Sequence, residues 1–181
     1  MSTVYWLLLI VGGVILLSIV LPSFVGGAWS PTSMRRVRAM LEMAKLAPGE
    51  TLYDLGAGDG RIIITAAREF GARAVGIEID PLRAALCNWR VFLGRLGDRV
   101  RVERANFFDV NLRDADVVTF FLSQGAADKL KDKFSAELRP GARIVSHRRP
   151  LPGWRPAAVD ERFGLYLYVT GVTGESHATD T

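Results

Sequence analysis

The sequence predicts an α/β fold, in which a parallel sheet with helices on both faces is preceded by one N-terminal transmembrane helix. Three observations support this prediction. Strand-like and helix-like segments alternate from Thr51 onward, a glycine-rich turn follows the first strand, and no charged side chain occurs before Arg35. Such alternation is typical of parallel sheets whose ligand crevice lies at the carboxyl ends of the strands. The 181 residues have room for one such domain and a short appendage.

The N-terminal segment is apolar enough to span a bilayer. The chain is 49% hydrophobic but only 9% aromatic, and all 23 Lys and Arg and all 19 Asp and Glu lie beyond Met34. As a helix, Val4 to Val25 would extend roughly 33 Å, the thickness of a bilayer core, with Tyr5 and Trp29 at the two interfaces. The alternatives are a buried core helix or a cleaved signal peptide, but residues 1–3 supply no basic region.

The charges that follow this segment predict its orientation. Arg35, Arg36 and Arg38 come directly after it and nothing basic precedes it. The positive-inside rule therefore places the rest of the chain in the cytoplasm and the N-terminus outside. We expect a single-pass anchor over residues 1–29, a domain over 30–173 and a disordered tail over 174–181.

Each element of the domain has its own sequence signal. The first helix, over 34–46, keeps its apolar residues on one face and ends at Pro48 and Gly49. Short β-branched runs bounded by turn residues predict strands, and longer amphipathic runs predict the helices between them. The expected strands cover 51–55, 74–79, 100–104, 115–122 and 142–146, the expected helices cover 61–70, 82–96 and 126–138, and 155–159 with 163–172 should form a closing hairpin.

Composition restricts the classes of function. Cys87 is the only cysteine, which excludes an intramolecular disulfide and a cysteine-based zinc site. The net charge of +4 comes from interspersed acids and bases rather than from long basic blocks. We therefore expect no metal and no nucleic acid partner.

The glycine-rich turn is the main candidate for ligand binding. Gly56, Gly58 and Gly60 let the backbone turn sharply and approach a ligand, and the first amides of the next helix favour an anionic group. Dinucleotide-binding folds use a similar turn, but the spacing here is G-x-G-x-G rather than G-x-G-x-x-G. Asp54 ends the preceding strand, where a carboxylate suits a ligand with an ammonium group and would repel a pyrophosphate.

The ends of the next two strands supply further candidates. Glu78 ends the second strand, where its carboxylate can accept both hydroxyls of a ribose. Asp80 is better explained as the N-cap of the following helix. Asn106 is a candidate partner for the edge of an adenine ring, and Ile79 and Phe107 are candidates for its two faces. The alternative, that Phe107 simply belongs to the core, stays open.

These motifs resemble those of the seven-strand, class I S-adenosylmethionine-dependent methyltransferases. The resemblance is carried by Asp54 to Arg61, Gly76 to Pro81, Asp116 to Thr119 and Arg139 to His147, and it covers nearly all of residues 30–172. More narrowly, these motifs resemble those of the small archaeal protein-lysine methyltransferases and their membrane-anchored mitochondrial relatives, which modify the ADP/ATP carrier and the ATP synthase c subunit. The resemblance implies a Rossmann-like sheet, S-adenosylmethionine as cofactor and a lysine of a membrane protein as acceptor.

The resemblance also implies which residues form the site. The cofactor site would comprise Thr32, Asp54, Gly56, Ala57, Gly58, Gly60, Glu78, Ile79, Asn106 and Phe107. The acceptor pocket would be lined by Leu122, Ser123, Gln124, His147 and Trp154, of which the last four are placed by topology alone. The chain departs from the family where Ser33 replaces the second proline of Pro-Thr-Pro, where Asn106 replaces an acid, and where Leu122 begins Leu-Ser-Gln instead of Leu-Leu-Pro.

The expected reaction is direct displacement at the sulfonium methyl group by a neutral amine. Free lysine, with a pKa near ~10.4, is mostly protonated at neutral pH. An apolar pocket beside a cation favours the neutral amine, so no dedicated base is required. His147 ends the fifth strand and is a candidate helper, although a structural role explains it better.

Three other functions stay open. The first is a methyltransferase for a lipid-soluble small molecule such as a quinone or a lipid. The second is a module that binds S-adenosylmethionine without turnover. The third is a nicotinamide-dependent oxidoreductase, against which the spacing of the glycines argues.

Overall fold

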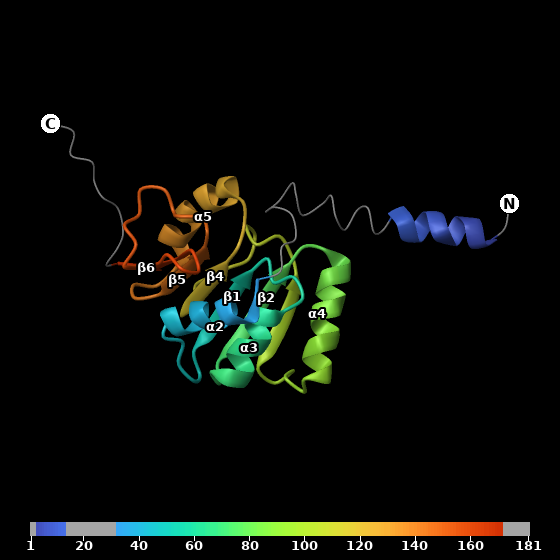
Figure 1. Cartoon of the computed structure of the whole chain (residues 1–181), viewed down its shortest axis with the longest axis horizontal. Coiled ribbons are helices and arrows are strands. Elements are labelled where there is room, and N and C mark those ends of the chain that lie inside the picture. Colours follow the sequence, from blue (N-terminus) through green and yellow to red (C-terminus); the bar gives the residue numbers. More distant parts are fainter. Residues whose placement is uncertain (1–2, 14–31, 172–181) are drawn as a thin grey trace.

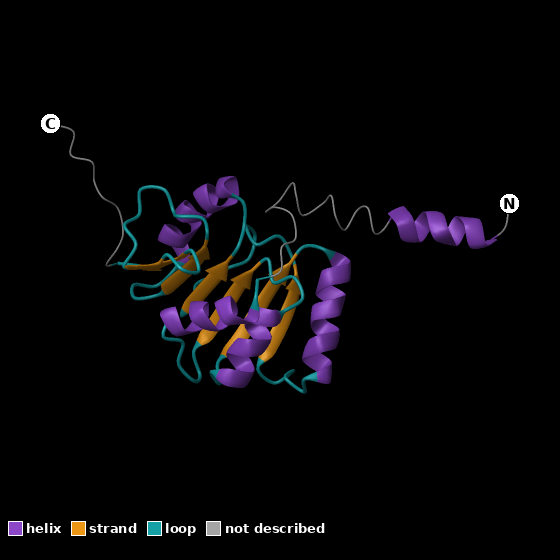
Figure 2. Ribbon diagram, viewed as in Figure 1, coloured by secondary structure: helices purple, strands orange, loops and turns teal. Residues whose placement is uncertain are grey.

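The computed structural model describes residues 3–13 and 32–171. Residues 32–171 form a seven-stranded sheet with helices on both faces (Figures 1 and 2). The strands are β1 (Thr51–Leu55), β2 (Arg73–Glu78), β3 (Val100–Arg104), β4 (Val117–Phe120), β5 (Arg143–His147), β6 (Ala158–Asp160) and β7 (Leu165–Val169). The helices are α2 (Met34–Met43), α3 (Arg61–Glu69), α4 (Pro81–Leu93) and α5 (Gln124–Glu137).

The order of the strands places a topological switch point at the centre of the sheet. The order is β3-β2-β1-β4-β5-β7-β6. β1 pairs in parallel with both β2 and β4, so the chain winds outward from β1 in opposite directions. The expected closing hairpin is confirmed, because β7 runs antiparallel to both β5 and β6. In open α/β sheets, ligands bind outside the carboxyl ends of the strands at such a switch point.

Two hydrophobic clusters pack the helices against the two faces of the sheet. One cluster joins the sheet to α2, α3 and α4, and includes Met40, Ile63 and Cys87. The other joins it to α5, and includes Phe134 and Tyr168. Segment 105–116, after β3, and segment 148–157, after β5, contain turns and loops rather than helices. The face that α5 covers therefore carries one helix, and the opposite face carries three.

Several element boundaries differ from the sequence prediction for local reasons. β4 is shorter than the expected 115–122, because the Ala115 amide turns back to Leu112 and Asp116 uses its carboxylate to accept from the Thr51 amide at 2.8 Å. α2 ends before the expected 46, because Lys45 adopts a φ of 49°. α5 begins earlier than the expected 126, because Ser123 caps it.

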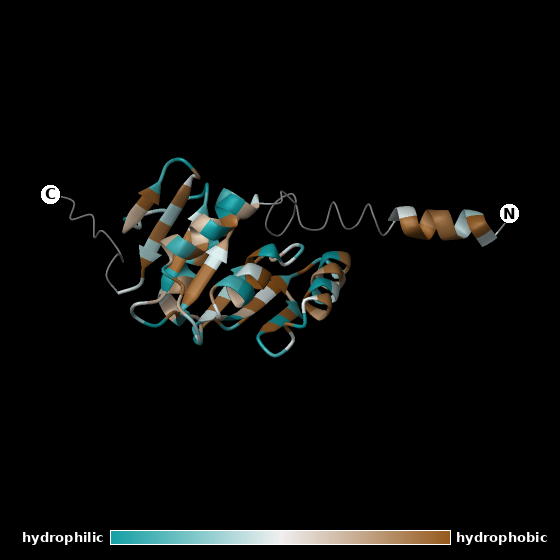
Figure 3. Cartoon of the chain, turned by 60° about the horizontal axis from the view of Figure 1, so that its bottom comes forward, coloured by the Kyte–Doolittle hydropathy of each residue, from teal (hydrophilic) through white to brown (hydrophobic). Residues whose placement is uncertain are grey.

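The N-terminal helix of residues 3–13 is exposed and almost wholly hydrophobic (Figure 3). The remainder of the expected span, residues 14–25, lies outside the described residues, as does the tail from 172 onward. Within 3–13 and 32–171, no helix combines the length and the hydropathy needed to cross a membrane.

Candidate active site

Asp54 lies buried at the carboxyl end of β1. Its side chain is 3% exposed, and its Oδ1 accepts a hydrogen bond from the Thr119 hydroxyl on β4 at 2.8 Å. Burial raises the pKa of Asp54 to about 7, an effect that the hydrogen bond from Thr119 partly opposes. The negative charges of Glu78 and Asp59 raise this pKa further. The end of β1 therefore holds an acid that lacks a cationic partner among the described residues.

The glycine-rich turn is tied to the end of β2 by backbone hydrogen bonds. The amides of Gly56 and Ala57 both donate to the Ile77 carbonyl at 2.9 Å, and the Gly58 amide donates to Glu78 Oε2 at 2.8 Å. Gly56 and Gly58 have φ values of 85° and 58°, a region that side chains with a Cβ rarely adopt. The ends of β1 and β2 are thus held side by side.

Gly60 is required by both its conformation and its neighbours. It precedes α3 with a φ of 78°, and a Cβ at this position would overlap the Cys87 Sγ on α4. Gly76 on β2 is similarly confined, because a Cβ there would lie 2.6 Å from Ile63 Cδ1. Glycines therefore let α3 and α4 approach the turn closely.

Glu78 is buried, and its hydrogen bonds leave it capacity to accept more. The side chain is 5% exposed; Oε2 accepts from Gly58, and Oε1 accepts from the Asp80 amide at 2.9 Å. Each carboxylate oxygen can accept a second hydrogen bond, so Glu78 retains the capacity to bind a diol. The expected N-cap at Asp80 is confirmed, because its Oδ1 accepts from the Arg83 amide at 2.8 Å.

Asp59 holds the glycine-rich turn in place through two arginines, a role that was not predicted from the sequence. Its two carboxylate oxygens each accept at 2.8 Å from the Arg61 guanidinium, and it also pairs with Arg90 on α4. Arg61 donates at the same time to the Thr32 carbonyl at 2.6 Å. Burial raises the pKa of Asp59, but its two arginine partners lower it by more. No sequence signal identified Arg90, because it lies on a helix distant from the turn in sequence.

Residues after β3 are held by local contacts. Asn106 Oδ1 accepts from the Phe108 amide at 3.1 Å and so closes a turn. Phe107 is 4% exposed, belongs to the cluster beneath α5 and packs on Phe108 with ring centroids 4.6 Å apart. This burial supports the core alternative for Phe107. Ile79 stays partly exposed next to the end of β2.

The three predicted acceptor residues after β4 begin α5. Leu122 is buried against the turn, because a Cβ at Gly56 would lie 3.1 Å from its Cδ2. Ser123 is the N-cap of α5, accepting from the Ala126 amide at 3.3 Å. Gln124 donates to the Pro150 carbonyl at 3.0 Å, which links the loops after β4 and β5.

His147 and Trp154 are both buried, in different surroundings. His147 is 1% exposed and packs on Phe121 with centroids 4.0 Å apart; within the described residues neither of its ring nitrogens has a hydrogen-bond partner. Burial, with additional repulsion from nearby arginines, lowers the pKa of His147 to about 4. Trp154 is 6% exposed and packs edge-on against Tyr168 in the core, and within the described residues its indole nitrogen has no hydrogen-bond partner.

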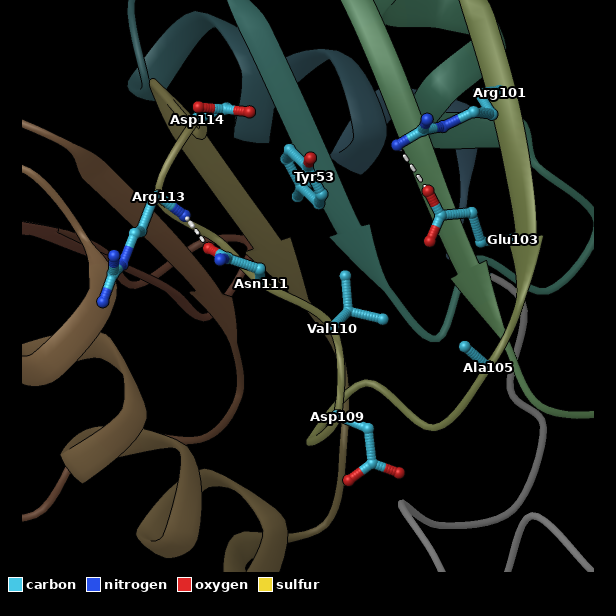
Figure 4. A pocket seen from close by; sticks show the side chains of 9 residues that line it. All are labelled: Tyr53, Arg101, Glu103, Ala105, Asp109, Val110, Asn111, Arg113 and Asp114. Carbon is cyan, nitrogen blue, oxygen red and sulfur yellow. Dashed lines mark hydrogen bonds and ion pairs between the residues drawn. The ribbon is translucent and has the colours of Figure 1, made fainter.

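A cavity of about 590 Å³ lies elsewhere, on the sheet face beneath segment 105–114 (Figure 4). It contains none of the predicted site residues. Its lining mixes both charges, including the Arg101 and Glu103 ion pair at 2.5 Å, and so favours no single ligand chemistry. The lining residues are Tyr53, Arg101, Glu103, Ala105, Asp109, Val110, Asn111, Arg113 and Asp114. We therefore place the candidate active site at the strand ends.

Comparison with known proteins identifies the family. A family profile described as the ANTKMT methyltransferase domain matches residues 54–158, more than half of the chain. A protein-lysine N-methyltransferase of Saccharolobus islandicus is 43% identical over 150 residues, which cover 78% of this chain and 92% of that protein. The mouse adenine nucleotide translocase lysine N-methyltransferase is 40% identical over 128 residues, which cover 70% of this chain and 55% of the mouse protein.

A solved structure shares the fold of this chain and holds S-adenosyl-L-homocysteine. An RNA methyltransferase from Salinibacter ruber, determined in complex with S-adenosyl-L-homocysteine, superimposes with a TM-score of 0.79 and 33% identity, covering 83% of this chain and all of that chain. The chain therefore belongs to the ANTKMT methyltransferase family, and it is an S-adenosylmethionine-dependent methyltransferase.

Proposed function

We propose that the protein is a membrane-anchored methyltransferase that transfers methyl groups from S-adenosylmethionine to protein lysine. The observation that carries the proposal is the 43% identity to the archaeal protein-lysine N-methyltransferase over 92% of its length. The mouse relative, named for a lysine of the adenine nucleotide translocase, supports the same acceptor chemistry.

The proposed cofactor site uses the two buried carboxylates at the strand ends. Asp54, buried and without a cation of its own, is suited to the ammonium group of the cofactor. Glu78 has the free acceptor capacity that the two ribose hydroxyls need. The backbone of Gly56, Ala57, Gly58 and Gly60 leaves room for the ligand above β1, and Thr32, held by Arg61, borders it. Ile79 and Asn106 would contact the adenine.

The proposed reaction is a single displacement. The cofactor supplies an electrophilic methyl group on a sulfonium. The lysine ammonium group first gives a proton to water. The neutral nitrogen then forms a bond to this carbon as the carbon–sulfur bond breaks, which yields a methylammonium group and the uncharged thioether of S-adenosylhomocysteine. The chain contributes position and exclusion of water through Leu122, Ser123 and Gln124, which lie between the turn and the loop after β5. With its low pKa, His147 at this edge is neutral at physiological pH and adds no cation that would repel a protonated lysine.

The anchor and the orientation form the second part of the proposal. The exposed apolar helix of residues 3–13 and the absence of charge before Arg35 support a membrane span over residues 4–25. Arg35, Arg36 and Arg38 support a cytoplasmic domain. The acceptor would then be a lysine near the cytoplasmic face of a membrane protein.

RNA is a second candidate acceptor, because the similar Salinibacter structure is described as an RNA methyltransferase. Labelled S-adenosylmethionine, the full-length protein and membranes prepared with their associated RNA separate the candidates in one experiment. We expect label in the protein fraction, and much less with the Asp54→Asn variant at a sub-saturating concentration of cofactor. Label in extracted lipid or in RNA would contradict the lysine proposal.

A further inference from the structure

The outer face of α4 carries a stripe of hydrophobic side chains that belong to neither of the two hydrophobic clusters. The stripe consists of Leu82, Leu86, Trp89, Phe92 and Leu93, which are 45%, 42%, 58%, 77% and 59% exposed. The spacing of Leu82, Leu86, Trp89 and Leu93 places them along one side of the helix. The inner side of α4 is a separate face, where Ala84, Cys87 and Val91 are buried.

The position of α4 leaves this stripe open. The helix packs on β2 and β3 and forms one edge of the domain (Figure 1), and its turns carry both hydrophobic and hydrophilic positions (Figure 3). Single exposed hydrophobic residues are ordinary on protein surfaces, but a contiguous row with two large aromatic rings marks an interaction site.

The charges around the stripe are cationic. From residue 81 to residue 97 the chain contains Arg83, Arg90 and Arg95 and no acid. Beyond it, exposed Arg99 and Arg104 lie at the two ends of the edge strand β3, whereas Arg101 lines the cavity on the other face of the sheet. Three of the arginines in this stretch have acidic partners, because Arg90 pairs with Asp59, Arg99 with Asp98 at 3.6 Å and Arg101 with Glu103 at 2.5 Å. An excess of positive charge remains after these pairs are counted. The border of the stripe is therefore complementary to an anionic surface.

We propose that α4 is an interfacial helix that docks the domain onto an anionic lipid surface. Leu, Trp and Phe on one face with arginine beside them are the composition of helices that lie in the headgroup region. A second copy of the chain fits less well, because a symmetric contact would bring the same arginines together. The inference rests on the anchoring part of the proposed function and adds an orientation to it.

Docking through α4 would fix the active site relative to the bilayer. The helix begins three residues after Glu78, so its first turn lies beside the proposed ribose site. A flexible tether alone would leave the crevice free to rotate, whereas a tether and an interfacial helix together hold one edge of the crevice against the headgroups. Acceptor lysines at the membrane surface would then be preferred over soluble ones.

Spin labels on the full-length protein test the contact directly. Phe92→Cys and, as a matched exposed control on β6, Val159→Cys are labelled and reconstituted in vesicles of phosphatidylcholine and phosphatidylglycerol. Cys87 is buried with its pKa raised to about 12, so it should not react. We expect the label at 92 to be accessible to oxygen and shielded from an aqueous nickel complex, and the label at 159 to be open to both. Vesicles without phosphatidylglycerol should reduce the shielding at 92.

The outcomes separate this inference from the proposed function. If the chain floats with vesicles but the label at 92 is as open to nickel as the label at 159, the interfacial helix is wrong and the anchor stands. If the chain does not float with vesicles, the anchoring proposal fails and the inference falls with it. A short distance between labels at 92 on two chains would show that α4 instead contacts a second copy.

A functional variant adds a second readout. The double variant Phe92→Gln, Leu93→Gln should lower the methylation rate of a membrane-embedded acceptor several-fold and leave the rate on a soluble lysine peptide unchanged. Val159→Gln should change neither rate. Equal losses on both acceptors would contradict a docking role for the stripe.

Discussion

At the scale of single residues, Asp54 combines a structural cost with a proposed binding role. Its carboxyl group is buried without a cation, and burial raises its pKa to about 7. When folding raises the pKa of a carboxyl group, the contribution of that group to stability is fully present below its ordinary pKa. For Asp54 this contribution is lost as the pH rises through about 7. A cationic ligand has the opposite effect on the pKa of Asp54, because it favours the charged carboxylate over the protonated acid.

The first prediction concerns cofactor affinity. S-adenosylhomocysteine should bind more tightly as the pH rises from about 5 to about 7, by up to ~tenfold per pH unit, because binding must expel the Asp54 proton. Asp54→Asn should weaken binding by roughly 10- to 100-fold at about pH 8 and remove this pH dependence. Calorimetric titration measures both effects, with the exposed Asp109→Asn as the control. Unchanged affinity in Asp54→Asn would refute the assignment.

The second prediction concerns His147, whose pKa folding lowers to about 4. The unfolded chain takes up a proton near the ordinary histidine pKa, so this residue favours folding above that pH and the benefit is lost as the pH falls toward 4. Between about pH 7 and pH 5 the wild type should lose roughly 2 kcal/mol more stability than His147→Phe. Urea unfolding at both pH values measures the difference, and parallel losses would show that His147 does not titrate as described.

At the scale of elements, close packing of the turn against α4 explains Gly60. We expect Gly60→Ala to destabilise the fold by about 2–4 kcal/mol, because it adds an overlap with Cys87 to an unfavourable backbone conformation. The double variant Gly60→Ala, Cys87→Ala removes the overlap and should recover part of this loss relative to Cys87→Ala alone. Gly97→Ala, where a Cβ meets open space, is the control in denaturant unfolding.

Sequence patterns predicted the elements better than the contacts between them. β1 and β3 match their expected bounds because turn residues flank short runs rich in strand-forming residues. Asp54 and Glu78 could be proposed as site residues because each lies at the carboxyl end of a parallel strand. Arg90 was missed because its pairing with Asp59 depends on how α4 packs. The role of Phe107 stayed ambiguous, because the sequence pattern is the same whether an aromatic ring contacts a ligand or is buried in the core.

At the scale of the whole molecule, the apolar N-terminal segment and the domain are separable. Both hydrophobic clusters are built from residues from Val37 onward, and every residue of the 3–13 helix is exposed. A chain that begins at Gly27 should therefore keep its unfolding transition and its activity on a soluble lysine peptide, and lose its preference for membrane acceptors. Labelling rates in cells measure this preference. Equal rates on the same acceptors for both lengths would show that the anchor does not set specificity.

The acceptor atom is the central claim, and mass spectrometry tests it most directly. Membranes are incubated with the full-length protein and S-adenosylmethionine that carries a deuterated methyl group, and labelled peptides are then sequenced. The proposed function predicts deuterated methyl groups on the ε-nitrogen of lysine in membrane proteins, and far fewer of them with Asp54→Asn at a sub-saturating concentration of cofactor. Label confined to lipid or nucleic acid, with no labelled lysine, would contradict it.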